Sequence, residues 1–204
     1  SRPGLSKGSS GEAVSANFEL PAMPGPGEWS SSDPERAFDA HFEPLDSLLG
    51  PDRRGYRNHC LRVLVNVRAL APSLDLAPVI VALVFHDLAL WTHRTVDYIE
   101  PSAELAQRHL ERVGPADWLA PVDVMIRWHH KQRRYAGPHA EFAEPFRRAD
   151  MGDFTFGLMG AVPRAALQEG RGRYPNAGFH RMLFLRTLGR LATRPWSPFP
   201  MLRW

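Results

Sequence analysis

The chain of 204 residues contains a single cysteine, Cys60. One cysteine excludes an internal disulfide and any metal site built from several thiolates. No apolar run approaches the roughly 18 residues that a membrane-spanning helix needs. The first residues, "SRPGLSKGSS", also lack the apolar core of a signal peptide. The sequence therefore predicts a cytoplasmic protein that does not enter a membrane.

Lysine is almost as scarce, since it occurs only at Lys7 and Lys131, and arginine supplies most of the positive charge. The formal net charge is +3. The arginines fall in short pairs, without the clustered basic stripe and interleaved aromatic residues that are typical of nucleic-acid-binding proteins. We therefore expect no nucleic-acid partner, whereas a small anionic substrate is compatible with this charge.

Alternating strand patterns and internal repeats are missing too, and the composition divides the chain into two parts. Residues 1–32 are rich in Ser, Gly and Pro, which predicts an extended or flexible N-terminal arm. Apolar residues in this arm are able to pack against the domain or against a neighbouring subunit, so a homo-oligomer is compatible with the sequence. Residues 33–204 form the predicted domain, and the hydrophobic content of 44% is enough for a substantial core.

The domain has a helical pattern throughout. Asp33 is a predicted N-cap and Pro34 occupies the first helical position of a helix that extends toward Leu49. The segment 77–90 is apolar on every side, which predicts a central helix. Further helices are predicted at 56–71, 101–113, 115–132 with a bend or restart at Pro121, 140–160, 163–169 and 177–193. The predicted fold class is all-α.

Four residues on these predicted helices have the chemistry of metal ligands: His59, His86, Asp87 and Asp150. Each lies within or beside an apolar stretch, where an unpaired buried carboxylate costs several kcal/mol or more. A helix bundle can bring such side chains to one inward point. Imidazole and carboxylate ligands suit a divalent transition metal such as Mn, Fe, Co, Ni or Zn, which would also remove the cost of burying the carboxylates.

The order of these residues resembles the HD-domain superfamily of metal-dependent phosphohydrolases, over residues 55–195. The segments "YRNH", "FHDLALWTHRTVDYIEPS", "HHK", "FRRADMGD" and "YPNAGFH" are similar to a set of uncharacterised bacterial HD-domain proteins. The resemblance implies an HD-domain helical bundle with the metal held between helices by His59, His86, Asp87 and Asp150. It also implies hydrolysis of a small phosphate ester, either a nucleotide or another phosphomonoester. Candidate catalytic residues are Asp87, His129, His130 and Lys131.

The number of metal ions is open at this level. Two-metal members of the superfamily add two histidines, of which the later matches His129 or His130. The earlier position reads Glu100-Pro101, where Glu100 is a candidate second-metal ligand but also an acid explained by the dipole of a helix N-terminus. His93, Asp97 and His109 are other candidates for this position. The sequence favours one ion over two. With two irons, the alternative is a mixed-valence di-iron oxygenase acting on a small organic substrate; a non-enzymatic HD protein is a third interpretation.

Several other residues have side chains suited to an anionic substrate. Lys131 and the candidate substrate-binding arginines could hold a phosphate or carboxylate, but each is equally explained as a solvated charge. Asp153 shares a helix face with Asp150 and is predicted to support the metal ligands from behind. The candidate substrate-binding residues are Arg57, Arg147, Asn176 and His180.

Overall fold

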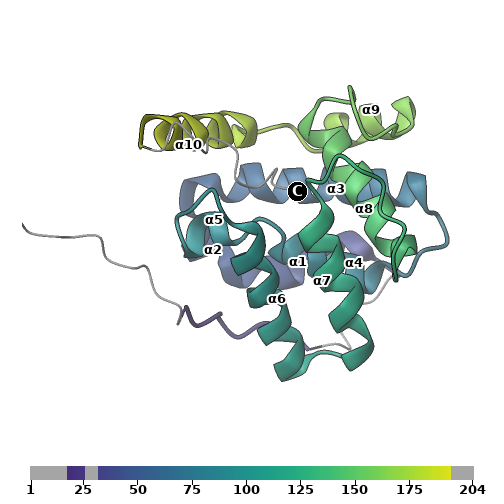
Figure 1. Cartoon of the computed structure of the whole chain (residues 1–204), viewed down its shortest axis with the longest axis horizontal. Coiled ribbons are helices and arrows are strands. Elements are labelled where there is room, and N and C mark those ends of the chain that lie inside the picture. The colour runs from purple at the N-terminus through teal and green to yellow at the C-terminus, as the bar shows by residue number, and fades with distance from the viewer. Residues whose placement is uncertain (1–17, 26–31, 194–204) are drawn as a thin grey trace, which may run out of the picture.

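The computed structural model describes residues 18–25 and 32–193, and every regular element in these residues is helical (Figure 1). The all-α prediction is therefore confirmed. The α-helices are α1 (Pro34–Phe42), α2 (Asp46–Leu49), α3 (Arg53–Leu70), α4 (Leu76–Phe85), α5 (Ala89–Thr92), α6 (Ile99–Val113), α7 (Leu119–Trp128), α8 (Ala140–Phe154), α9 (Arg164–Arg173) and α10 (Phe179–Thr193). Short 3₁₀ turns are η2 (Glu43–Leu45), η3 (Gly50–Asp52) and η4 (Ala116–Trp118).

Helix starts follow the local sequence. The carboxylate of Asp33 accepts a hydrogen bond from the backbone N–H of Arg36 at 3.2 Å, with Pro34 at the first helical position. Asp75 begins α4 in the same way, through a 3.1 Å bond from the N–H of Ala77. The predicted restart near Pro121 takes the form of the turn η4 followed directly by α7.

Helix α4 is the centre of the fold, because all ten of its residues are buried. It packs against α1, α3, α6 and α7. The predicted helix 77–90 is nevertheless interrupted: α4 ends at Phe85, residues 86–88 form a turn, and α5 follows. The hydroxyl of Tyr56 lies in this break, 3.2 Å from the carbonyl of Val84 and 3.3 Å from the backbone N–H of Asp87. One buried side chain thus satisfies backbone groups that a continuous helix would pair internally.

The other long helices surround this centre. Helix α3 packs along α8 and α9, while α6 and α7 form a neighbouring pair joined through η4 (Figure 1). Helix α10 extends along one side of the molecule and contacts α3. Consequently α3, α7, α8 and the turn after α4 all present residues to one interior region.

The described part of the N-terminal arm, residues 18–25, has no helix or strand. Its apolar residues Phe18, Leu20 and Met23 are partly buried against the core. The rest of the predicted arm and the end of the predicted domain, residues 194–204, lie outside the described residues. Among the residues that the structure describes, no helix combines the length and the apolar character of a membrane span.

Candidate metal centre

His59 lies on α3 and is 2% exposed. Its two ring nitrogens face two different carboxylates of α8. Nε2 lies 3.2 Å from Oδ1 of Asp150, and Nδ1 lies 2.8 Å from Oδ2 of Asp153. Because Asp150 and Asp153 are three residues apart, they lie on the same face of the helix, as the sequence predicts. His59 is therefore held between α8 residues through both nitrogens.

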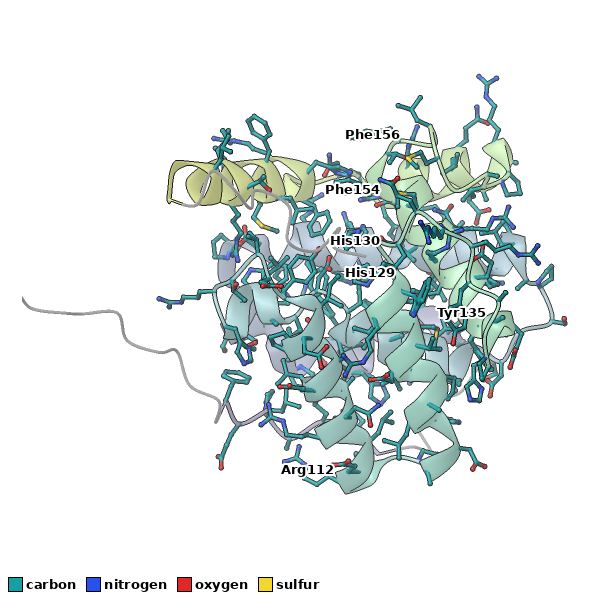
Figure 2. All side chains as sticks on the ribbon, in the orientation of Figure 1. Arg112, His129, His130, Tyr135, Phe154 and Phe156 are labelled. Atoms are coloured by element: carbon teal, nitrogen blue, oxygen red, sulfur yellow. The ribbon has the colours of Figure 1, made fainter. Side chains whose placement is uncertain are left out.

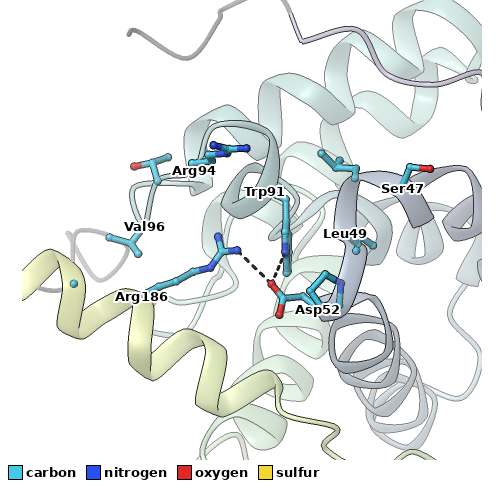
Figure 3. Close-up of a pocket in the computed structure, with 12 residues that line it drawn as sticks. Ser47, Leu49, Asp52, Trp91, Arg94, Val96 and Arg186 are labelled. Carbon is cyan, nitrogen blue, oxygen red and sulfur yellow. Dashed lines mark hydrogen bonds and ion pairs between the residues drawn. The ribbon is translucent and has the colours of Figure 1, made fainter. Parts of the chain in front are cut away.

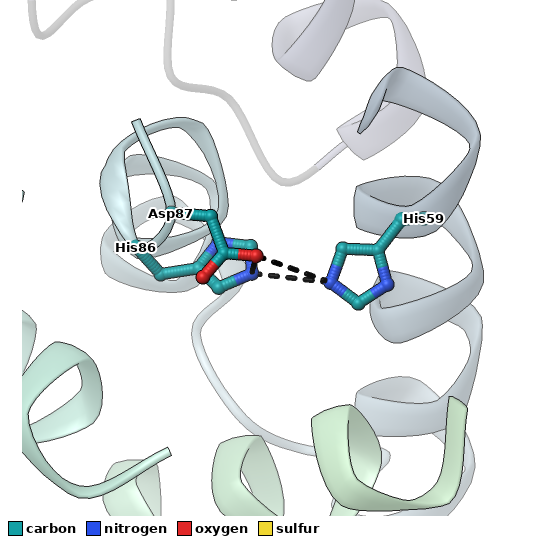
Figure 4. Close-up of side chains that lie close together, drawn as sticks. All are labelled: His59, His86 and Asp87. Atoms are coloured by element: carbon teal, nitrogen blue, oxygen red, sulfur yellow. Dashed lines mark hydrogen bonds and ion pairs between the residues drawn. The ribbon is translucent and has the colours of Figure 1, made fainter. Parts of the chain in front are cut away.

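His86 and Asp87 reach the same point from the turn that follows α4. The Nδ1 of His86 lies 2.9 Å from the carbonyl of Leu83, so it donates there and leaves Nε2 as an acceptor. This Nε2 lies 3.2 Å from Nε2 of His59 and 3.4 Å from Oδ2 of Asp87 (Figure 4). Consecutive residues of a continuous helix point in directions about 100° apart. The break after Phe85 allows both side chains to face His59.

Asp150 contributes a fourth donor from α8. Its Oδ1 lies 3.2 Å from Nε2 of His59 and 3.9 Å from Nε2 of His86. Its second oxygen, Oδ2, is buried and has no hydrogen-bond partner among the described residues. A buried carboxylate oxygen without a partner is expensive, so this atom calls for a cation or a bound donor.

His129 and His130 follow the last residue of α7 and are both buried. Nδ1 of His129 lies 2.5 Å from the carbonyl of Ile126, and its Nε2 lies 3.5 Å from Oδ1 of Asp87. Neither Nε2 of His129 nor Oδ1 of Asp87 has a hydrogen-bond partner within the described ranges. His130 instead contacts Tyr98: Nε2 of His130 lies 2.6 Å from Oη of the tyrosine.

The donor atoms lie 3.2–4.0 Å apart, close to the spacing of ligands around a single ion. Ligands about 2.1 Å from an ion lie about 3.4 Å apart in a tetrahedral site and about 3.0 Å apart at neighbouring octahedral positions. The donors of His59, His86 and Asp87 lie within 4.8 Å of one another, and Asp150 adds the contacts given above. Asp87, His129 and His130 form a second such group, which shares Asp87 with the first. These buried residues could hold a metal.

The charges of the cluster are strongly coupled. Burial lowers the pKa of His59, but the hydrogen bonds of Asp150 and Asp153 outweigh it and raise the pKa to about 9. Burial lowers the pKa of His86 to about 4, which keeps this imidazole neutral. Burial alone would raise the pKa of Asp87, yet the surrounding histidines hold it well below its usual range. The carboxylates are thus ionised and His86 is in its metal-binding form.

A buried ion pair between Arg62 and Asp153 holds His59 in place. Arg62, on the same helix as His59, donates from Nε to Oδ1 of Asp153 at 2.6 Å and from Nη2 to Oδ2 at 2.8 Å. Its Nη1 donates to the carbonyl of Tyr174 at 2.9 Å. The geometry fits the supporting position predicted for Asp153. Arg62 was missed by sequence reasoning, although its spacing of three residues from His59 on an apolar helix is a usable signal.

The sequence prediction also missed Tyr98, which lies in the segment "VDYIEPS" and is 2% exposed. In the same segment, the structure corrects the expectation for Glu100. The carboxylate of Glu100 is 62% exposed and forms an ion pair with Arg127, so it does not join the buried cluster. The start of α6 therefore contributes Tyr98 to the interior and directs Glu100 outward.

Two of the predicted substrate-binding residues, Arg57 and Arg147, form ion pairs away from the cluster. Arg57 lies two residues before His59 and faces a different side of α3, where it pairs with Asp39 at 2.6 Å. Arg147 is buried, pairs with Glu144 at 2.6 Å and donates to the carbonyl of Lys131 at 2.9 Å. The structure therefore gives Arg57 and Arg147 structural ion pairs rather than open positions beside the cluster. Lys131 follows His130 and is partly exposed.

Asn176 and His180 line a separate pocket of about 240 Å³, together with Arg62, Asp153, Phe156 and Arg171. Asn176 accepts a hydrogen bond from the backbone N–H of His180 at 3.4 Å. Because Asp153 faces Nδ1 of His59, this pocket lies on the side of the ring opposite the converging donors. Figure 2 shows His129 and His130 near the middle of the molecule, with Phe154 and Phe156 beyond them and Arg112 at the far end of α6.

A cavity of about 850 Å³ lies in another part of the molecule. It is lined by residues of α2, η3, α5, the loop that follows α5, and α10 (Figure 3). Asp52 accepts hydrogen bonds there from Nε1 of Trp91 at 3.0 Å and from Nη2 of Arg186 at 3.4 Å. None of the histidine donors of the cluster is among the described residues that line it.

Comparison with family models, with curated proteins and with solved structures finds no match to this chain. The resemblance to HD-domain proteins therefore stays a prediction from the motifs. The convergence of the buried donors, in contrast, is a property of the structure itself.

Proposed function

We propose that the chain is a metal-dependent hydrolase of small phosphate esters, with one divalent ion held by His59, His86, Asp87 and Asp150. The observation that carries the proposal is the meeting of these four donors from α3, α8 and the turn after α4, all nearly excluded from water. Buried histidines and carboxylates with partnerless atoms are costly unless a cation compensates them. The order of the motifs agrees with the HD-domain resemblance.

A divalent ion at this position would act as a Lewis acid toward a phosphoryl oxygen and lower the pKa of a water molecule. The chain's own residues then have distinct tasks. Oδ2 of Asp87 faces His86, whereas its Oδ1, 3.5 Å from Nε2 of His129, could accept a hydrogen bond from the attacking water. Burial lowers the pKa of His129, but Asp87 and Asp150 raise it overall, so this imidazole can donate a proton to the leaving oxygen.

One observation favours the alternative of a di-iron oxygenase. The second donor group, Asp87, His129 and His130, shares a carboxylate with the first, which is the arrangement that two neighbouring ions require. Such an enzyme would act on a small organic substrate with O₂. The exposed side chain of Glu100 removes one candidate ligand for a second ion, which weakens this alternative.

The test is hydrolysis of p-nitrophenyl phosphate and a panel of nucleoside monophosphates by the full chain with Mn²⁺, Co²⁺ or Ni²⁺. We expect turnover that falls by about 10³-fold or more in His86→Ala, because loss of a ligand removes the ion. Asp123→Asn, at a half-buried ion pair with Arg127 outside the cluster, is the matched control and should keep full activity. Two irons per chain with consumption of O₂, and no phosphate release, would establish the oxygenase instead.

A further inference from the structure

Tyr98 is the one residue at the start of α6 that reaches the candidate metal centre in the described structure. It is 2% exposed, and its Oη lies 2.6 Å from Nε2 of His130. The phenol ring also lies near His129, with ring centroids 6.4 Å apart. A hydroxyl at 2.6 Å is in direct hydrogen-bond contact, so Tyr98 occupies the space in front of that nitrogen.

The two neighbours of His130 select one tautomer. When the phenol donates the hydrogen bond in this contact, Nε2 of His130 is the acceptor and carries no proton. The remaining proton is on Nδ1, which faces Oδ2 of Asp150 at 3.9 Å. That oxygen has no hydrogen-bond partner in the described part of the chain. The two atoms are too far apart for a direct hydrogen bond, but a proton on Nδ1 is electrostatically favoured beside this carboxylate oxygen, whereas the other tautomer would place a lone pair on that side.

We propose that Tyr98 is a positioning residue that keeps His130 from binding a metal and so limits the centre to one ion. The inference rests on the proposed metal centre and concerns its second donor group, Asp87, His129 and His130. Nε2 of His130 is covered by the phenol and Nδ1 carries a proton directed at Asp150. The second group is thereby reduced to Asp87 and His129, two donors where a stable site needs at least three from the protein.

The experiment measures metal ions per chain by mass spectrometry after equilibration of the full chain with Mn²⁺ or Co²⁺ and removal of free ion. We expect one ion in the wild type, two in Tyr98→Phe, and one again in the double variant Tyr98→Phe with His129→Ala. One ion in both wild type and Tyr98→Phe would overturn the inference and leave the proposed centre intact. Two in the wild type and one in Tyr98→Phe would overturn it by making Tyr98 a ligand. No ion in the wild type would overturn the proposed centre, and this inference with it.

A second measurement needs no variant and guards against a folding defect in Tyr98→Phe. Two-bond ¹⁵N–¹H correlation spectra of the imidazoles distinguish the two neutral tautomers of each histidine. The inference requires His130 of the wild type to carry its proton on Nδ1, with the signal assigned by its loss in His130→Gln. A proton on Nε2, or a cationic ring at neutral pH, would contradict it.

Discussion

At the scale of single residues, the candidate centre contains histidines whose protonation is set by the hydrogen-bond partner of the ring nitrogen that faces away from the centre. His86 keeps Nε2 available because Nδ1 faces the carbonyl of Leu83. His59 is oriented by Asp153, which is itself held by two hydrogen bonds from Arg62. Such carboxylate–histidine contacts fix the ring and raise its basicity as a ligand. The chain Arg62–Asp153–His59 is therefore expected to set the affinity for the ion.

Asp153→Asn tests that role without touching a proposed ligand. An amide removes the negative charge that supports His59 and breaks the charge-assisted bonds with Arg62. We expect the affinity for Mn²⁺ or Co²⁺ to fall by about 10- to 100-fold, measured by competition with a chelating dye. Asp123→Asn, which changes a half-buried, ion-paired aspartate outside the cluster in the same way, should leave the affinity unchanged. Equal affinities for Asp153→Asn and wild type would show that the contact with His59 does not matter.

The raised pKa of His59 predicts how the metal-free protein responds to pH. A histidine whose pKa rises from 6.5 to about 9 on folding contributes stability that is complete below pH 6.5. That contribution is lost as the pH rises to about 9, and His129, whose pKa is also raised, acts in the same direction. The loss from His59 is on the order of 3 kcal/mol.

Urea unfolding in the presence of EDTA, at pH 6.5 and at pH 9, measures this difference directly. The free energy of unfolding should be lower at the higher pH, and His59→Gln should show a smaller difference. The lowered pKa of His86 affects stability only below pH 6.5, so it does not interfere in this range. A free energy that does not change between the two pH values would refute the coupling of His59 to the carboxylates.

At the scale of the elements, the site depends on where helices end. The turn at 86–88 is what allows a histidine and the following aspartate to face the same point. Periodicity predicted the apolar, central character of this segment and most of the helices. It could not predict the break, because the break is stabilised by the hydroxyl of Tyr56 from another helix. Helix α8 also ends earlier than predicted, at Phe154 rather than at residue 160. The chain that follows turns back and packs against α8.

Gly160 makes that return possible. Its φ is +84°, and a Cβ added there would lie 2.2 Å from the carbonyl oxygen of Arg148 on α8. Gly160→Ala should therefore lower the free energy of unfolding by about 2 kcal/mol or more, from backbone strain and steric overlap. Gly172→Ala is the matched control, since a Cβ there meets nothing within 4 Å and lies in helix α9. That change should stabilise by up to about 1 kcal/mol.

Chemical denaturation of the two alanine variants and the wild type measures whether the free energy of unfolding falls in Gly160→Ala and rises in Gly172→Ala. If Gly160→Ala were as stable as the wild type, the close approach of this loop to α8 would be wrong. If Gly172→Ala were the more damaging change, the assignment of an open helical position would be wrong.

At the scale of the whole molecule, the candidate site is a meeting of residues that are far apart in the sequence. His59 and Asp150 are brought together because α3 packs along α8 around the buried α4. The motifs were enough to predict which residue types would converge. They were not enough to predict the direction of each side chain, because Glu100 and Tyr98 differ by two positions and face opposite environments. Arg57, two positions from His59, likewise faces another side of its helix and pairs with Asp39.

The central claim is that His59, His86, Asp87 and Asp150 hold one metal ion. A crystal structure of the full chain, grown with Mn²⁺ or Co²⁺ and recorded at the absorption edge of that metal, tests it most directly. We predict one anomalous peak per chain, about 2.0–2.2 Å from Nε2 of both histidines and from one oxygen of each aspartate. No peak at this position, or a peak bound by a different set of residues, would contradict the account.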